Sequence, residues 1–248
     1  MIIRAVSQNA MCWKTKGGEF EERRERMKRL FSRLDPDFIG AQEVTDRWKA
    51  YFEEDLPGFG TVFAFRGKLD HEGTPIYYRR DRFDLVESGR FWLSETPEKE
   101  SRAKGSAYLR IACWGIFERK EDGRRLLFIN THLDCKSERA RILGARIIAD
   151  FIGDKGAGLP AVLTGDMNDV SYSEAIETLR EKMTDARLSA PVTCETNTHM
   201  SEFGSPADAS IDYILLKDAR AARYSVEKEC DGNFPQSDHY AVVADIEL

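Results

Sequence analysis

The stretch Val162-Leu163-Thr164-Gly165-Asp166-Met167-Asn168-Asp169 is a short apolar run that ends in glycine and continues at once into carboxylate and amide groups. This pattern predicts a buried strand that delivers polar side chains at its carboxyl end, the edge where ligands bind in α/β proteins. Asp166 and Asn168 are two residues apart, so in extended backbone they point to the same side. Their oxygens suit a hard cation, an attacking water or a phosphate. For this segment alone, an Asx-rich turn that caps the strand is the alternative.

Length and composition indicate one α/β domain that covers residues 1–248. No Gly/Ser-rich or Pro-rich linker divides the chain, and 42% hydrophobic with 32% charged residues is usual for a globular protein. No apolar stretch reaches membrane-spanning length, and the amino terminus enters an expected strand without a signal-type core. We therefore expect a cytoplasmic protein that does not associate with membranes.

The cysteines and the net charge limit the function classes further. The five cysteines are odd in number and show no C-x-x-C spacing, which argues against a disulfide framework and a thiolate zinc site; they are Cys12, Cys113, Cys135, Cys194 and Cys230. The net charge is −6 and the pI is near 5.4, which disfavours a surface that attracts duplex nucleic acid by charge alone.

The order of expected elements is that of a layered α/β fold with antiparallel pairing in its middle. Strands are expected at 2–9, 38–43, 61–66, 75–79, 83–93, 108–118, 125–130, 160–165, 211–216, 224–228 and 240–246. Helices are expected at 20–34, around Trp48 and Phe52, at 137–152, and after a capping box of Ser171 and Glu174. The arginines between Arg23 and Arg29 are expected on the solvent face of the first helix.

Polar residues gather where six of these segments end or begin. They are Asn9, Gln42-Glu43, Asn130-Thr131-His132-Leu133-Asp134, Gly165-Asp166-Met167-Asn168, Ile211-Asp212-Tyr213 and Ser237-Asp238-His239. A lone histidine beside a strand is usually a satisfied structural residue, but His132 and His239 each lie close to an aspartate. The sequence therefore predicts that these segments form one site.

In this order, the six motifs resemble the endonuclease/exonuclease/phosphatase superfamily. That superfamily includes pancreatic deoxyribonuclease, apurinic endonucleases, bacterial sphingomyelinases, inositol polyphosphate phosphatases and deadenylases, and the resemblance covers essentially the whole chain. Pro75–Phe83 and Phe91–Pro97 further resemble a compact bacterial branch of it. The resemblance implies a four-layer α/β sandwich, with two mixed β-sheets packed face to face and helices on the outside.

The resemblance also implies a divalent-metal-dependent phosphoesterase. Glu43 matches the main metal ligand, and a hard carboxylate suits Mg²⁺, with Mn²⁺ as the alternative cofactor. Asn9 would assist at the metal or at a phosphate oxygen, and Asp238 would belong to the metal shell. Strand-end hydrogen bonding is the alternative role for Asn9 and for Asn168.

The catalytic roles implied by the resemblance fall on five residues. Asp166 would orient or deprotonate the attacking water, and Asn168 would hold a phosphate oxygen. His239 would donate to the transferred phosphoryl group, with Asp212 fixing its tautomer and favouring its charged form. His132 would be a second donor to the phosphate.

Three further residues are candidates for substrate contacts. Tyr78 would contact the phosphate or the leaving group, or else pack in a sheet. Arg110 would bind substrate phosphate, or else be a solvated strand residue. His199, in the loop before the strand that begins near Asp212, is a substrate-binding candidate.

These residues predict hydrolysis of a phosphate ester. A phosphodiester on a small or single-stranded substrate is favoured, because the chain has little length to spare for insertions that grip a duplex. A phosphomonoesterase acting on a sugar or inositol phosphate is the alternative. A catalytically silent binding module of the same fold is the third hypothesis, and the intact set from Glu43 to His239 argues against it. The sequence predicts no particular oligomeric state.

Overall fold

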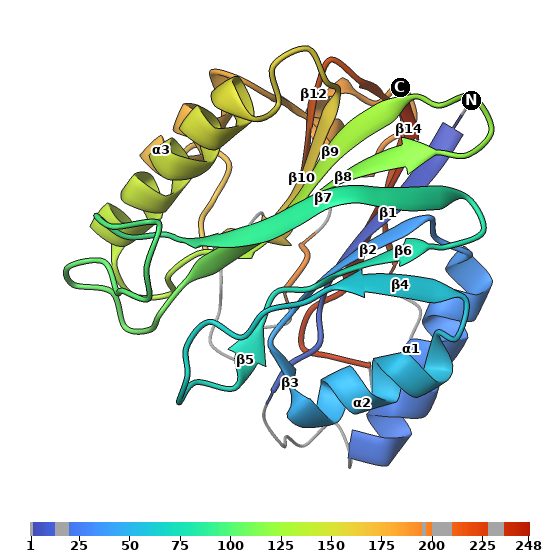
Figure 1. The fold of residues 1–248 in the computed structure, drawn as a ribbon, viewed down its shortest axis with the longest axis horizontal. Coiled ribbons are helices and arrows are strands. Elements are labelled where there is room, and N and C mark those ends of the chain that lie inside the picture. Colours follow the sequence, from blue (N-terminus) through green and yellow to red (C-terminus); the bar gives the residue numbers. More distant parts are fainter. Residues whose placement is uncertain (1, 13–19, 195–196, 200–209, 228–235) are drawn as a thin grey trace.

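The computed structural model describes residues 2–12, 20–194, 197–199, 210–227 and 236–248. In this part of the chain, two large β-sheets lie face to face (Figure 1). The first, in the order β13-β14-β1-β2-β6-β4, contains β1 (Ile2–Asn9), β2 (Phe38–Gln42), β4 (Phe59–Val62), β6 (Ile76–Arg79), β13 (Arg220–Glu227) and β14 (Ala241–Glu247). The second, in the order β11-β12-β10-β9-β8-β7, contains β7 (Phe83–Trp92), β8 (Ile111–Arg119), β9 (Arg125–His132), β10 (Ala161–Asp166), β11 (Thr184–Asp185) and β12 (Asp212–Lys217).

The helices cover the outer faces of the two sheets. Figure 1 shows α1 (Phe20–Leu34) and α2 (Asp46–Asp55) on the side of the first sheet and α3 (Glu138–Asp154) on the side of the second. The shorter elements are α4 (Glu174–Arg180), α5 (Ala186–Ser189) and the two-stranded pair of β3 (Val44–Thr45) and β5 (Glu72–Gly73). The predicted four-layer α/β sandwich is confirmed.

Each large sheet is mixed, because it contains one parallel pair among antiparallel strands. In the first sheet β1 runs parallel to β2, with α1 between them in the chain. In the second sheet β9 runs parallel to β10, with α3 between them. The carboxyl ends of a parallel pair lie at one edge of the sheet. The polar residues that follow these four strands are therefore brought to one region.

Aromatic side chains fill the space between the sheets. The ring of Phe38 on β2 lies 4.6 Å from that of Phe83, 5.0 Å from Phe117 and 4.8 Å from Phe128, measured between centroids. All four are buried, and burial of such a side chain contributes about 1.5–3 kcal/mol. The alternation of inward residues along the strands thus holds the sheets face to face.

A buried polar contact, which we call the sheet-joining cluster (Gln42, Asn130 and Thr164), also links the sheets. The Asn130 amide donates to the carbonyls of Ala41 at 2.7 Å and Pro75 at 2.9 Å. Its Oδ1 accepts from Gln42 Nε2 at 2.7 Å and Thr164 Oγ1 at 3.0 Å. Asn130 is therefore a structural residue that spans both sheets.

The close approach of the sheets here depends on Gly40. A Cβ atom at Gly40 would lie 2.0 Å from Thr164 Oγ1 and 2.7 Å from Asn130 Oδ1, distances that no packed structure tolerates. Glycine is thus required where β2 faces the second sheet.

Several expected boundaries differ from the structure; the strand expected at 224–228, for example, is β13 and begins at Arg220. The cap of α4 is Ser173, whose side chain accepts from the Ile176 amide, rather than Ser171, because Ser173 directly precedes the first helical residue. The strand expected at 61–66 is β4, Phe59–Val62, and the one expected at 108–118 is β8, which begins at Ile111. Residues before Ile111 are held instead by the Asp134 carboxylate, which accepts from Ser106 Oγ at 2.7 Å and the Ala107 amide at 2.9 Å.

Among the described residues, no helix combines the length and the apolar character that crossing a membrane requires.

Candidate active site

The polar segments predicted from the sequence converge where the two sheets face each other. Asn9 and Gln42 are register partners at the ends of β1 and β2, and Glu43 follows directly. Asp166 pairs with His132 on β9 on one side and with Asp212 on β12 on the other. His239 lies just before β14, which runs antiparallel to β1, so it reaches the end of β1 as well. We call Asn9, Glu43, His132, Asp166, Asp212 and His239 the catalytic cluster.

Asn9 links carboxylates that belong to different sheets. Its Nδ2 donates to Glu43 Oε1 at 3.2 Å and to Asp166 Oδ2 at 3.1 Å. Its Oδ1 accepts from the Met11 amide at 2.8 Å, and the Cys12 amide donates to Glu43 Oε2 at 2.8 Å. The loop after β1 therefore fixes both Asn9 and Glu43.

Two histidines flank Asp166. His239 Nδ1 lies 2.9 Å from Asp212 Oδ2, and His239 Nε2 lies 3.7 Å from Asp166 Oδ2. His132 Nε2 lies 3.4 Å from the same oxygen. All four side chains are buried. The geometry gives His239 a carboxylate behind it and leaves its second ring nitrogen directed toward the reaction space.

The two histidines differ in their charge state. Burial disfavours the charged form of His239, but the carboxylates of Asp212 and Asp166 raise its pKa to about 10. Burial lowers the pKa of His132 well below its usual value, and the nearby Arg110 guanidinium lowers it further. At neutral pH, His239 is therefore an imidazolium and His132 is neutral.

The carboxyl groups differ as well. Burial raises the pKa of Asp166 to about 7, against the opposing effect of His239. Burial also acts to raise the pKa of Glu43, but the Cys12 amide is among the groups that lower it, and the net shift is downward. Glu43 is thus held ionised, whereas Asp166 exchanges a proton near neutral pH.

Backbone strain is concentrated at this site. Five non-glycine residues in the described part of the chain have a positive φ, and three of them, Met11 (57°), Glu43 (56°) and Asn168 (49°), lie here. Such conformations cost about 1–3 kcal/mol each and persist where the surroundings hold them. At Asn168, the amide donates to Asp166 Oδ1 at 2.9 Å and Nδ2 to the Leu133 carbonyl at 3.0 Å.

The donor set fits a hard divalent cation. Asp166 and Asp212 offer carboxylate oxygens within 4.8 Å of each other, and Glu43 is joined to Asp166 through Asn9. Asp212 Oδ1 is buried and accepts no hydrogen bond from any described residue. Several carboxylates thus surround one imidazolium, and carboxylate oxygens are the ligands that Mg²⁺ and Mn²⁺ take in proteins.

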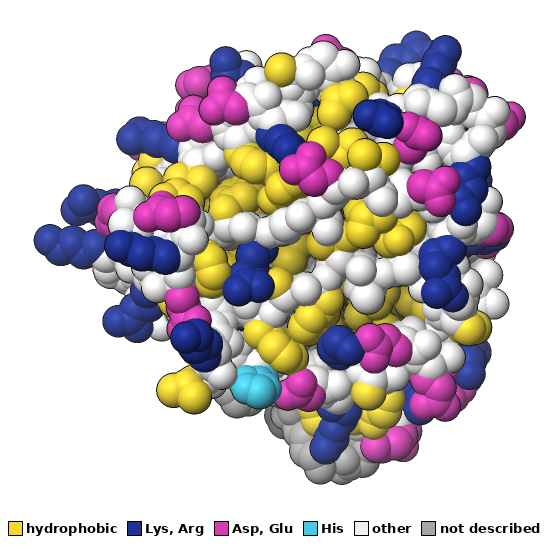
Figure 2. Space-filling view, in the orientation of Figure 1, with side chains coloured by type: hydrophobic (Ala, Val, Ile, Leu, Met, Phe, Trp, Pro, Cys, Tyr) yellow, Lys and Arg dark blue, Asp and Glu magenta, His cyan; other side chains and the backbone are white. Residues whose placement is uncertain are grey.

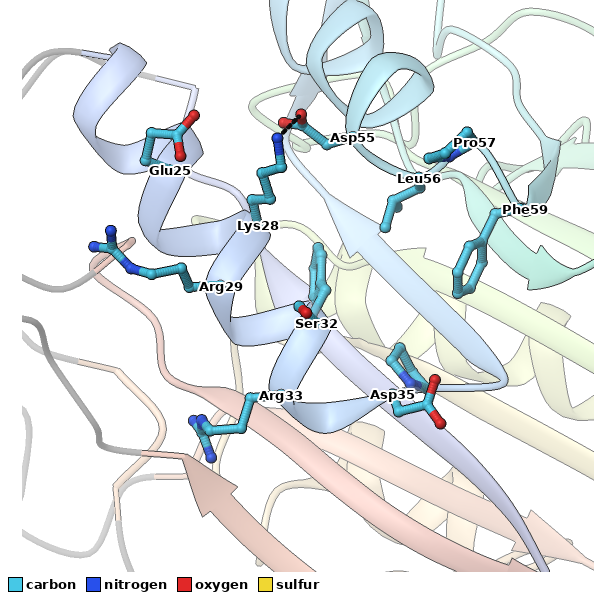
Figure 3. Close-up of a pocket in the computed structure, with 13 residues that line it drawn as sticks. Glu25, Lys28, Arg29, Ser32, Arg33, Asp35, Asp55, Leu56, Pro57 and Phe59 are labelled. Carbon is cyan, nitrogen blue, oxygen red and sulfur yellow. Dashed lines mark ion pairs between the residues drawn. The ribbon is translucent and has the colours of Figure 1, made fainter.

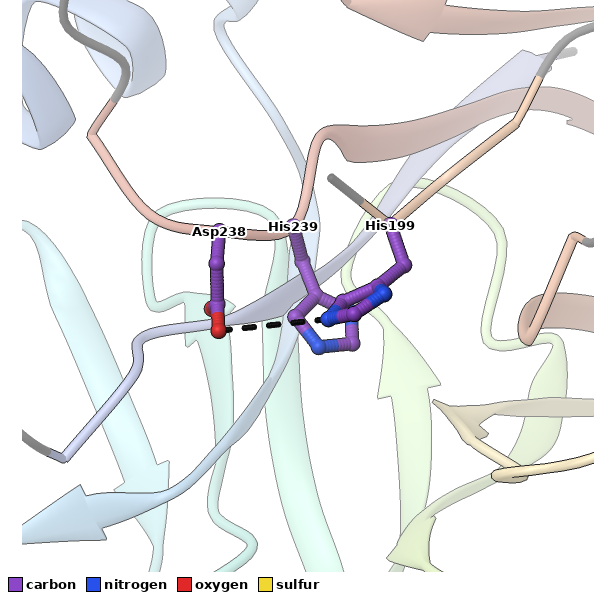
Figure 4. Close-up of side chains that lie close together, drawn as sticks. All are labelled: His199, Asp238 and His239. Carbon is purple, nitrogen blue, oxygen red and sulfur yellow. Dashed lines mark ion pairs between the residues drawn. The ribbon is translucent and has the colours of Figure 1, made fainter. Parts of the chain in front are cut away.

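His199 and Asp238 extend the site on the His239 side (Figure 4). The His199 and His239 rings lie 4.6 Å apart between centroids, and their backbones form a bridge. His199 Nε2 lies 4.0 Å from Asp238 Oδ2. Both sequence-predicted residues are therefore placed beside the catalytic cluster.

Tyr78 does not lie with these residues, and its placement corrects the expected phosphate contact. It pairs with Phe38 near the beginning of β2, whereas Glu43 follows the end of that strand. Its ring lies 4.9 Å from that of Phe117 and close enough to Gly60 that a Cβ there would be 2.4 Å from it. Tyr78 packs in the sheet, which was the alternative role predicted from the sequence.

Arg110 lies beside His132, and the two residues line one small cavity. Only 6% of Arg110 is exposed, so the alternative of a solvated strand residue is wrong. It immediately precedes β8, and its Nη1 lies 3.9 Å from Glu72 Oε1.

Arg23 is a residue of the site that the sequence prediction assigned to solvent. It is 1% exposed, and its Nη2 donates to the Ala10 carbonyl and to the Met11 carbonyl, the latter at 2.7 Å. Its Nε donates to the Gln236 carbonyl at 3.1 Å. Arg23 therefore connects the loop that carries Asn9 to the segment that carries His239. The signal was available, since position 23 falls on the buried stripe of α1 formed by Phe20, Met27, Leu30, Phe31 and Leu34.

A groove of about 640 Å³ lies elsewhere, between α1 and the turn from α2 to β4 (Figure 3). Its walls include Phe31, Leu56 and Phe59, and Lys28 spans it to Asp55 at 3.2 Å. These residues lie near the beginning of β2, at the opposite end of that strand from Glu43. The groove contains none of the predicted site residues.

The chain is similar to proteins of a known family. A model of the "Endonuclease/Exonuclease/phosphatase family" matches residues 11–239. No curated protein matches the chain.

Solved structures similar to the chain include bacterial and vertebrate proteins. An endonuclease/exonuclease/phosphatase from Bacteroides vulgatus is 26% identical, with a TM-score of 0.92 over 100% of this chain and 99% of that one. The mannosyl-6-phosphatase Bt3783 of Bacteroides thetaiotaomicron is 26% identical, with a TM-score of 0.89 over 99% and 100% of the two chains. D. rerio TDP2 complexed with single-strand DNA product is 14% identical, with a TM-score of 0.81 over 100% and 99%, and shares the fold.

Proposed function

The chain belongs to the endonuclease/exonuclease/phosphatase family, and on that premise we propose that it is a divalent-metal-dependent hydrolase of phosphate esters. The observation that carries the proposal is the charged His239, held by Asp212 and facing Asp166 next to the Asn9–Glu43 pair. Hydrolysis of a phosphate ester needs a donor to the phosphoryl oxygens, a base for the water and neutralisation of charge. The cluster offers a group for each task.

His239 donates from Nε2 to the phosphoryl group, since Nδ1 is bound to Asp212. Asp212 keeps the imidazole charged and fixes the orientation of its ring. Asp166 accepts a proton from the attacking water, for which a pKa of about 7 is suited. Water, base and donor are thus held within one buried group of side chains.

The neutral side chains position the phosphate. Asn168 uses one amide hydrogen at the Leu133 carbonyl, and we assign the other to a phosphate oxygen. Neutral His132 serves as a second donor from Nε2. Because neither residue carries charge, they orient the phosphate without adding to the charge of the site.

Glu43, assisted by Asn9 and with Asp238 nearby, would hold Mg²⁺ or, alternatively, Mn²⁺. When bound, such an ion neutralises the phosphate oxygens and stabilises the leaving oxygen. The ionised state of Glu43 and the surplus of carboxylates support this assignment.

A small or single-stranded phosphodiester is the first candidate substrate. The family model spans most of the chain, which leaves little length for additional segments that would grip a duplex. On the face shown in Figure 2, Lys and Arg side chains alternate with Asp and Glu around hydrophobic patches. On this face, such mixing gives no single-sign field that would attract a duplex. We therefore favour a small or single-stranded substrate over a duplex.

A phosphomonoester of a sugar is the second candidate. It is supported by the 26% identity to a mannosyl-6-phosphatase over the full length of both chains. The similarity to TDP2, at 14%, concerns the fold alone. The third hypothesis, a catalytically silent module, is opposed by the intact cluster and its charge states.

The proposal is tested by hydrolysis of bis(p-nitrophenyl) phosphate, p-nitrophenyl phosphate, a dinucleotide and a hexose 6-phosphate, each with Mg²⁺, Mn²⁺ or EDTA. We expect metal-dependent turnover that EDTA abolishes and excess Mg²⁺ or Mn²⁺ restores. Turnover of diesters alone selects the first candidate, and turnover of monoesters alone selects the second. Turnover that is indifferent to EDTA, or none of any substrate by the folded protein, would contradict the proposal.

A further inference from the structure

A second polar site adjoins His132 on the side away from Asp166. A small cavity there is lined by Arg66, Glu72, Thr74, Leu109, Arg110 and His132. It measures about 10 Å³, the room that one water-sized group requires. His132 belongs both to this cavity and to the catalytic cluster, so the two sites adjoin through one side chain.

Three buried polar atoms of the cavity residues have no hydrogen-bond partner in the described part of the chain. They are Arg66 Nε, which forms an ion pair with Asp70, and the pair Arg110 Nε and His132 Nδ1. A buried donor or acceptor left unsatisfied costs about 1–3 kcal/mol, so a group that satisfies both would bind favourably. A hydroxyl is suited, since it accepts from the guanidinium N–H and donates to the imidazole nitrogen. Donation to Nδ1 also fixes His132 in the tautomer that donates from Nε2.

The guanidinium groups at the cavity already have carboxyl partners, which argues for an uncharged ligand group. Glu72 lies between Arg66, with which it pairs, and Arg110, at 3.9 Å. Arg66 Nε also pairs with Asp70 at 2.7 Å. A second phosphate would have to compete with these carboxyl groups and would gain little here. A glutamate and an arginine side by side can instead bind the adjacent hydroxyls of a polyol, because the carboxylate accepts hydrogen bonds and the guanidinium donates them.

Tyr108 provides an exposed ring at this place. The residue is 42% exposed, and the guanidiniums of Arg66 and Arg110 lie over its ring, with Cζ 5.0 Å and 5.4 Å from the centroid. A ligand would therefore stack on the part of the ring that these groups leave exposed. The loop that carries it is fixed, since Ser106 Oγ bridges the Tyr108 carbonyl and Asp134 Oδ2 at 2.7 Å each. Asp134 follows His132 by two residues, so the strand end that presents His132 also anchors Tyr108. A fixed, exposed aromatic ring is a platform on which a flat or ring-shaped ligand can stack.

We propose that Tyr108 and the Arg66–Glu72–Arg110 cluster form the subsite for the leaving group of the substrate, and that this group is a hydroxylated ring such as a sugar. The ring stacks on Tyr108, and one hydroxyl enters the cavity between Arg110 and His132. A nucleobase fits less well, because its planar edge presents several donors and acceptors where the cavity admits one group. The inference rests on the proposed phosphoester hydrolysis and selects sugar phosphates among its substrates.

The test compares a hexose 6-phosphate with the ringless glycerol 3-phosphate, using wild type, Tyr108→Ala and Tyr108→Phe. In Tyr108→Ala we expect KM for the hexose phosphate to rise about tenfold, with kcat little changed, because stacking is lost. Tyr108→Phe keeps the ring and should restore the wild-type KM. Glycerol 3-phosphate should show no such dependence on residue 108. An unchanged KM for the hexose phosphate in Tyr108→Ala, or an equal rise for both substrates, would overturn the subsite.

A binding measurement separates failure of the subsite from failure of the proposed function. Saturation-transfer NMR with the hexose phosphate and the metal-free protein should show contact at the ring protons in wild type and Tyr108→Phe, and lose it in Tyr108→Ala. If wild type hydrolyses no ester but shows this pattern, the hydrolysis proposal fails and the ring subsite stands. Absence of ring contact in wild type, or Tyr108-dependent contact with a dinucleotide but not the hexose phosphate, would overturn the sugar assignment.

Discussion

The sheet-joining cluster and the catalytic cluster lie a few residues apart on the same strands, yet they use their hydrogen-bonding groups differently. Asn130 is neutral, and its amide makes four hydrogen bonds to groups of both sheets. Asp166, two residues beyond Thr164, shares a buried space with a second carboxylate and two imidazoles. The first arrangement completes its hydrogen bonds within the protein, whereas the second retains charge and unused acceptors.

This difference separates stability from function. A fully paired buried amide stabilises a unique packing of the sheets. Buried carboxylates in surplus, with positive φ at Glu43 and Asn168, raise the free energy of the folded state and suit ligands not present in the chain itself. Substitutions in the two clusters should therefore act on different measurements.

The largest effect is expected from His239→Ala. Removing the charged donor should lower kcat by about 10³-fold, as expected for a general acid or phosphoryl donor. In the metal-free protein the free energy of unfolding should also fall, because the buried carboxylates of Asp212 and Asp166 lose their positive partner. Steady-state kinetics and thermal unfolding measure the two quantities. Activity near that of wild type would remove His239 from the mechanism.

The next prediction compares two asparagine variants, one of which should affect mainly stability and the other mainly activity. Asn130→Ala should lower the free energy of unfolding by about 2–4 kcal/mol, since it leaves several buried groups unpaired. The molecules that remain folded should keep their activity.

Asn168→Gly is the matched variant, because glycine adopts the positive φ without strain. It should retain stability and lose activity. Denaturant unfolding and kinetics on both proteins provide the comparison. An Asn130→Ala protein as stable as wild type, or a fully active Asn168→Gly protein, would contradict the distinction between the sheet-joining cluster and the residues of the active site.

A smaller effect concerns the pH dependence of stability in the metal-free protein. Burial raises the pKa of Asp166 to about 7 in the folded state, above the value of about 3.9 in an unfolded chain. The stability contributed by protonated Asp166 is thus fully present below about pH 4 and is lost as the pH rises through 7. Asp166→Asn has no titratable group at this position, so its stability should not depend on this ionisation. Relative to the variant, wild type should lose about 1 kcal/mol or more over this range, measured by urea unfolding with EDTA. Parallel pH profiles of stability for wild type and Asp166→Asn would show that folding does not raise the pKa of Asp166.

The sequence predicted the parts of the site that follow from strand geometry. Polar residues after an apolar run, as at Asp166, mark a strand end, and strand ends meet at one edge. The sandwich was predicted through resemblance, because six weak motifs in order specify one family. His132 and His239 were correctly expected to lie near aspartates for the same reason.

The remaining features depend on side chains whose surroundings are set by tertiary packing. Tyr78 and Arg110 each had two alternative roles. Packing against Phe117 places Tyr78 in the sheet, and burial beside Glu72 excludes a solvated position for Arg110, whose contact with substrate phosphate stays a prediction. Arg23 lies on the buried stripe of α1, but a charged side chain is buried only where groups such as the Met11 carbonyl accept its hydrogen bonds. The sequence does not show where such groups lie. The strand expected at 108–118 begins only at Ile111, because the Asp134 carboxylate binds Ser106, Ala107 and Tyr108. No local sequence pattern encodes such a contact between distant residues.

The central claim, that the ionised Glu43 beside Asn9 belongs to a divalent-cation site, is tested most directly by titrating Mg²⁺ and Mn²⁺ into the protein in a calorimeter. Wild type should bind the ion at neutral pH. Glu43→Gln should lose that binding while keeping its thermal transition, and the surface variant Glu54→Gln should bind as wild type does. Equal binding by wild type and Glu43→Gln, or no binding of either ion by wild type, would contradict the account.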